Sequence, residues 1–148
     1  EITKLLTYAN FERAITLQDI ELLSVSTAQG DVFALVDALG NGQGKAAQAM
    51  LHRLLEEQDA FSIFGMVVRQ FRLLLLAREV IENRGNVQTE LKVHSFVAQK
   101  LTTQARHFSL ASLEAIYQRL LNIDEDAKTS QVSLDLALDI FVMELAGT

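Results

Sequence analysis

Residues 37–51, DALGNGQGKAAQAML, contain an aspartate, three glycines and a lysine ahead of an apolar run. A P-loop has glycine, four residues, Gly-Lys and then serine or threonine, because its backbone amides surround a phosphate and its hydroxyl holds magnesium. If Gly44 and Lys45 filled that role, Leu39 would replace the first glycine and Ala46 the hydroxyl residue. The preceding residues also repeat with a helical rather than a strand period. The segment therefore does not fit a nucleotide-binding loop.

The same segment has a second chemical interpretation, because it resembles the Asp-Gly-x-Gly-x-Gly segment of metal-dependent serine/threonine phosphatases. Asp37, Gly40 and Gly42 are the matching positions, with the aspartate as a ligand of a divalent metal. That chemistry needs further carboxylates on the strands of a β-sandwich, since one aspartate cannot hold a pair of hard cations. No later segment alternates as strands do. A phosphatase remains an alternative that predicts a β-rich fold.

A turn between two antiparallel helices is the simplest interpretation of residues 40–44, since glycine supplies the positive φ that such turns use. On this interpretation Ala46, Ala47 and Ala49 are small enough for the two helices to pack closely. Such a turn needs no ligand.

Other residue types that could do chemistry do not cluster along the chain. The histidines are His52, His94 and His107, and none has a second metal ligand three or four residues away. Residues 122–131, NIDEDAKTSQ, place Asp124 beside two more carboxylates but lack the glycine and terminal glutamate of an EF-hand, so a solvated turn is expected. The chain has no cysteine. No catalytic, metal-binding or cofactor-binding residue is therefore assigned.

Arg69 and Arg72 lie one helical turn apart in the segment RQFR, which also contains Gln70 and Phe71. Two guanidinium groups on one helix face could bind a phosphate or a carboxylate of a partner protein. Ion pairs within a helical bundle would use the same two side chains. The sequence alone leaves both interpretations open.

Hydrophobic periodicity and capping residues predict an all-α chain. Helices are expected over residues 1–9, 17–26, 32–39, 45–58, 60–83, 87–92, 95–108, 110–124 and 131–146. The expected N-caps include Thr16, Asp31, Ser109 and Ser130, and Gly85 is expected to end the longest helix. That helix is apolar around most of its circumference but contains arginines, so it is predicted to be the central helix of a soluble bundle rather than a membrane span.

The composition agrees with one globular unit or slightly more. The 148 residues are 49% hydrophobic and 22% charged and include no proline, which favours helices. The net charge of −6 disfavours a generally DNA-binding surface, because duplex affinity depends largely on lysine and arginine. The sequence has no signal-peptide pattern and begins at Glu1 rather than methionine, so a fragment of a longer protein is expected.

Six segments in order carry a resemblance to a known family: EITKLLTYA, ITLQDIELL, DVFALVDALGNGQGKAAQAMLHRLLEE, FGMVVRQFRLLLLAREV, VHSFVAQKLTTQARHFS and IDEDAKTS. Together they resemble the C-terminal part of the δ subunit of bacterial DNA polymerase III, a component of the sliding-clamp loader. The resemblance covers nearly the whole chain. It implies an all-α helical bundle of clamp-loader collar type, with residues 1–29 as the end of a truncated AAA+-type lid domain and residues 30–148 as the collar domain for oligomerisation.

The resemblance also implies a function. The chain would be an assembly module without catalysis or cofactor, in a cytoplasmic bacterial complex for DNA replication. Its collar would join δ′ and γ/τ-type subunits. The sliding clamp would be contacted by an N-terminal domain outside this chain. DNA would be contacted only within the full complex, and no contact with a membrane is expected. The positions that match the family pattern are Arg69, Gln70, Phe71, Arg72, Asp124 and Lys128. A helical scaffold of an unrelated complex is the remaining alternative.

Overall fold

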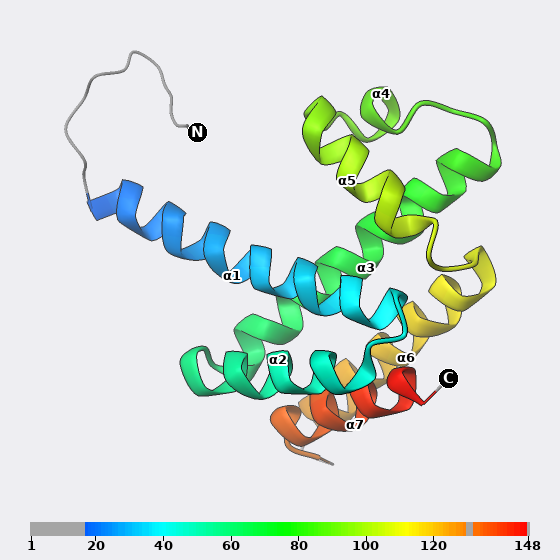
Figure 1. Ribbon diagram of the computed structural model, residues 1–148. Helices are drawn as coiled ribbons and strands as arrows, with labels where there is room; N and C mark the ends of the chain where they lie inside the picture. Colours follow the sequence, from blue (N-terminus) through cyan, green and yellow to red (C-terminus); the bar gives the residue numbers. More distant parts are fainter. Residues whose placement is uncertain (1–16, 130–131, 148) are drawn as a thin grey trace.

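The computed structural model describes residues 17–129 and 132–147, with side chains from Thr27 onward. These residues form helices and no strand (Figure 1). The helices are α1 (Leu17–Gly40), α2 (Gly44–Glu57), α3 (Ala60–Glu82), α4 (Val87–Leu91), α5 (Ser95–Ala105), α6 (Leu110–Lys128) and α7 (Leu134–Ala146). The all-α prediction is confirmed, and the described residues do not form the β-sandwich that a phosphatase would need. The expected caps Thr16 and Ser130 and the expected helix over residues 1–9 lie outside the described residues.

α1 differs from the sequence prediction. One continuous helix from Leu17 to Gly40 replaces the separate helices expected over residues 17–26 and 32–39. Asp31, the expected N-cap of the second of these, lies inside the helix. Gly30 lies inside it too, without a positive φ and with no atom within 4 Å of the position that a Cβ would take. A glycine beside an aspartate is therefore compatible with an unbroken helix here.

The turn between α1 and α2 is confirmed, with Gly42 at a φ of +76°. The prediction of close packing by alanines was partly wrong, since Ala46 and Ala49 are exposed. The close approach is made instead by Gly44, where an added Cβ would lie 2.5 Å from the Cβ of Ala146 in α7. The first residue of α2 thus sits directly against the last residue of α7.

Side chains that accept hydrogen bonds from backbone N–H groups fix the starts of several helices, among them α6 and α3. Ser109, a predicted N-cap, accepts a bond of 3.0 Å from the backbone N–H of Ser112 at the start of α6. Before α3, the carboxylate of Asp59 accepts bonds from the backbone N–H and the hydroxyl of Ser62, at 3.0 and 3.1 Å. These bonds lower the pKa of Asp59 below its usual value because they favour the charged form, and the bond from the backbone N–H of Ser62 has the larger effect.

α3 is the central helix, as predicted, and contacts every other helix of the described chain. Its length and apolar composition alone would also suit a membrane span, yet one face is buried in the bundle. Phe71 is fully buried on that face, with the rings of Phe108 and Phe141 packed edge-on at 5.9 and 6.0 Å. The helix ends close to the predicted position, followed by Arg84 with a φ of +58° and by Gly85, whose N–H donates to the Val80 carbonyl at 2.8 Å.

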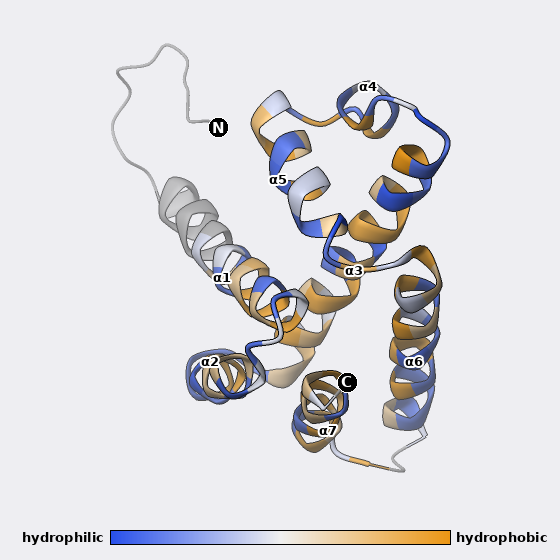
Figure 2. Ribbon diagram, turned by 45° about the vertical axis from the view of Figure 1, so that its right-hand side comes forward, coloured by the Kyte–Doolittle hydropathy of each residue, from blue (hydrophilic) through white to orange (hydrophobic). Residues whose placement is uncertain are grey.

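The other helices pack around α3, and α6 contacts both α3 and α7 (Figures 1 and 2). On one side α2 packs against α1 and α7. On the other side α4 and α5 pack against each other and against α3. We call these the α2/α7 side and the α4/α5 side.

Candidate functional site

The four residues of the segment RQFR have different environments in α3. Phe71 is in the core, and the half-buried Gln70 donates a hydrogen bond of 2.8 Å to the side-chain oxygen of Gln104 in α5. Arg69 and Arg72 are exposed. Neither arginine forms an ion pair with a side chain that the structure describes, so pairing within the bundle finds no support there. Arg69 and Arg72 are thus the exposed charged residues of this segment.

Gln104 connects three helices. Its side chain is fully buried, and its amide nitrogen donates to the backbone carbonyl of Phe33 at 3.1 Å and to the carboxylate of Asp37 at 3.5 Å. Together with the bond from Gln70, these contacts join α5 to both α1 and α3. A buried amide needs such partners, because burial without them costs free energy. We call these four residues the Gln104 network.

Asp37 therefore has a structural role in this fold. Its second carboxylate oxygen accepts a bond of 3.3 Å from the side chain of Asn41. No group of three or more histidines, cysteines, aspartates or glutamates that could hold a metal ion occurs in residues 17–129 and 132–147. The phosphatase hypothesis thus gains neither strands nor a ligand cluster from the described chain.

Asp124 and Lys128 lie within α6, whereas the sequence predicted a solvated turn over residues 122–131. The helix continues through Lys128, whose ammonium lies 2.9 Å from the carboxylate of Asp124 one turn earlier. The prediction was wrong because carboxylates typical of a turn are also tolerated in a last helical turn when a lysine pairs with them. Lys128 is largely exposed and Asp124 is about half exposed, so the pair reinforces the end of α6 only weakly.

The histidines do not converge. His52 in α2 lies 2.8 Å from the carboxylate of Asp139 in α7 and so connects these two helices. His94 precedes α5 and accepts a bond of 3.2 Å from the backbone N–H of Phe96. Both contacts are structural and involve no cluster of ligands.

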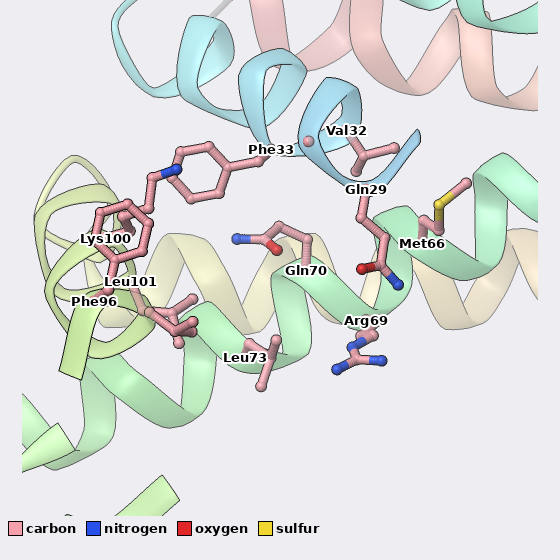
Figure 3. Close-up of a pocket in the computed structure, with 12 residues that line it drawn as sticks. Gln29, Val32, Phe33, Met66, Arg69, Gln70, Leu73, Phe96, Lys100 and Leu101 are labelled. Carbon is pink, nitrogen blue, oxygen red and sulfur yellow. The ribbon is translucent and has the colours of Figure 1, made fainter. Parts of the chain in front are cut away.

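A groove of about 480 Å³ opens between α1, α3 and α5 (Figure 3). It is lined by Gln29, Gly30, Val32, Phe33, Met66, Arg69, Gln70, Leu73, Phe96, Val97, Lys100 and Leu101. The ammonium of Lys100 lies 5.0 Å from the ring centroids of both Phe33 and Phe96. The two charged residues of the lining, Arg69 and Lys100, are both cationic. We call it the α1–α3–α5 groove.

Sequence reasoning did not identify the groove or Gln104. A glutamine in a helix carries no signal of the distant groups that it contacts. Phe96 and Val97 were equally hard to identify, because apolar side chains in a predicted helix are expected to be buried. Both are exposed in the structure, by 60% and 41%.

Comparisons with known proteins identify the fold. A family model described as "DNA polymerase III delta subunit, C-terminal domain" matches residues 29–145. The chain belongs to this family. DNA polymerase III subunit delta of Bacillus subtilis is 28% identical over 149 residues, which cover 98% of this chain and 43% of that protein. The solved structure of the DNA clamp loader delta protein of Bacillus subtilis matches with a TM-score of 0.77 and 28% identity, over 90% of this chain and 41% of that one.

The chain thus spans less than half the length of the delta proteins that it matches. The range matched to the C-terminal domain of delta includes the RQFR segment, the Gln104 network and the α1–α3–α5 groove. The resemblance seen in the sequence is therefore confirmed, and none of these matches is to a phosphatase.

Proposed function

We propose that this delta C-terminal domain is the collar of a clamp loader, an assembly module that holds its own protein in a ring with δ′ and γ/τ-type neighbours. The match of residues 29–145 to the family model is the observation that carries this proposal. In this proposal residues 30–148 form the collar, and residues 1–29 are the end of a lid domain. The start of the family match at residue 29 supports that division.

The packing of the domain suits such a role. Ring subunits whose motor domains tilt need a rigid attachment, because a soft one would dissipate the motion. The closely packed core around Phe71 provides rigidity. The domain itself has no catalysis or cofactor in this proposal, and it works in the bacterial cytoplasm.

The exposed arginines Arg69 and Arg72 are the proposed partner contacts among the positions that match the family pattern. Gln70, Phe71 and the pair of Asp124 and Lys128 have structural roles instead. The sliding clamp is contacted by the N-terminal part of the longer protein, and DNA only by the assembled complex. No membrane contact is proposed.

Size-exclusion chromatography with light scattering tests this function. Full-length delta protein mixed with the other clamp-loader subunits of the same organism should elute as a hetero-complex. A matched protein that lacks residues 30–148 should elute apart from those subunits. Equal assembly of the truncated protein would contradict the collar proposal, and a helical scaffold for other partners would give no complex in either case.

A further inference from the structure

The α1–α3–α5 groove combines exposed apolar surface with unpaired positive charge. Phe96 and Val97 stand at its edge, 60% and 41% exposed, and the apolar side chains of Leu73 and Leu101 line it. A large aromatic side chain left this exposed typically marks a contact surface when other apolar groups adjoin it. The groove therefore has the composition of the central part of a protein interface.

The charges of the groove indicate what occupies it. The chain carries a net charge of −6, yet Arg69 and Lys100 are the charged residues of the lining and no carboxylate accompanies them. Neither cation is ion-paired among the side chains that the structure describes. A segment that places a carboxylate against each cation and apolar side chains between them would complement this surface.

We propose that the α1–α3–α5 groove docks a segment of a neighbouring protein of the clamp loader, with apolar side chains flanked by carboxylates. This inference rests on the collar function proposed above and names the face and the chemistry of one contact. Single-stranded nucleic acid is the weaker occupant, because its affinity grows with the number of phosphates neutralised and the groove offers only two cations.

The groove is formed in advance of binding. The Gln104 network fixes α5 to α1 and α3. Lys100 is held at the groove by the faces of Phe33 and Phe96, as Figure 3 shows for the ring of Phe33. A surface already in its bound shape loses less conformational entropy on association, so less of the free energy of its apolar and charged contacts is offset.

Binding of full-length delta protein to the other clamp-loader subunits tests the proposal, with Phe96→Ala and Lys100→Glu as groove variants. Each should weaken assembly by about tenfold or more, because aromatic and cationic residues at the centre of an interface carry most of its affinity. Phe61→Ala and Lys45→Glu are matched controls, since Phe61 is 75% exposed, Lys45 is exposed at the start of α2, and neither residue lines the groove. The controls should change affinity by less than about twofold. Far-UV circular dichroism should show that all four variants remain folded.

The possible outcomes separate the groove from the collar function. Wild-type affinity of both folded groove variants would overturn the groove and leave the collar function intact, whereas failure of the unmodified protein to assemble would overturn both. Loss of self-association without loss of hetero-assembly would assign the groove to a second copy of this chain. Loss of binding to an oligothymidylate, with assembly intact, would assign it to single-stranded DNA. Either of the last two results would overturn the proposal.

Discussion

The two sides of α3 are built by different means. On the α2/α7 side the helices meet through apolar side chains and close backbone approach, as at Gly44 and Ala146, and the cross-helix bond of His52 lies at the surface. On the α4/α5 side a buried glutamine replaces part of the apolar contact, and a groove stays open beside Phe96. The α2/α7 side is thus held mainly by close apolar packing. The other combines directional bonds with a surface that a partner can use.

The largest expected effect is loss of the ring at the centre of the core. Phe71→Ala should lower the free energy of unfolding by about 3–5 kcal/mol, because it removes the edge-on contacts with Phe108 and Phe141 and leaves a cavity. Urea unfolding followed by circular dichroism measures it. Phe61→Ala, at a site 75% exposed, is the control and should cost less than about 0.5 kcal/mol. Similar losses in the two variants would mean that the core is not centred on Phe71.

The α4/α5 side is tested by removing its buried amide. Gln104→Leu keeps the volume but leaves the Gln70 amide and the Phe33 carbonyl without their partner, so unfolding free energy should fall by about 1–3 kcal/mol. Adding Gln70→Leu should cost less than the sum of the two single changes, because both act on one bond. A double-mutant cycle by urea unfolding measures this coupling. Simple additivity would show that the bond contributes nothing of its own.

Two glycines sharpen the difference in packing density. Gly44→Ala should destabilise by about 1–3 kcal/mol, because its Cβ would lie 2.5 Å from that of Ala146 and α2 or α7 must shift. Gly30→Ala should instead stabilise by about 0.5–1 kcal/mol, since it sits inside α1 with nothing within 4 Å of the new Cβ. Thermal unfolding gives the sign of both effects. Stability changes of the same sign for the two variants would contradict the difference between the tight packing at Gly44 and the open surface at Gly30.

The smallest expected effect concerns the end of α6. Lys128→Met breaks the pair with Asp124 and should cost about 0.5 kcal/mol or less, because both side chains are exposed to water. The loss should shrink further in high salt, where surface charges are screened. Urea unfolding at low and high ionic strength measures the difference. A loss that salt leaves unchanged would mean that Lys128 acts through packing of its alkyl chain.

The sequence predicted best what local interactions determine. The central position of α3 followed from its apolar circumference, and the start of α6 from Ser109, whose bonding partner lies three residues away. The resemblance to the δ family predicted the bundle as a whole. The prediction of RQFR as a family position was useful, but it did not separate the buried pair from the two exposed arginines.

The remaining features depend on contacts that are distant in sequence. Gln104 bonds to groups 34 to 71 residues away, and no local pattern distinguishes it from a surface glutamine. Asp31 is predicted to be a cap because aspartate favours that position, yet the helix continues on both sides of it. The groove exists only where three helices meet, so it belongs to the tertiary structure alone.

α1 is one long continuous helix. At 1.5 Å per residue, the distance from Leu17 to Leu35 is about 27 Å, without a hinge at Gly30. The helix extends away from the bundle at its Leu17 end (Figure 1), while Phe33 and Asp37 hold it to Gln104 at the other. A rotation of α1 by roughly 5° about Leu35 would move the Leu17 end by about 2 Å. Because Phe33 also lines the groove, one continuous helix connects the Leu17 end to the surface where a partner would dock.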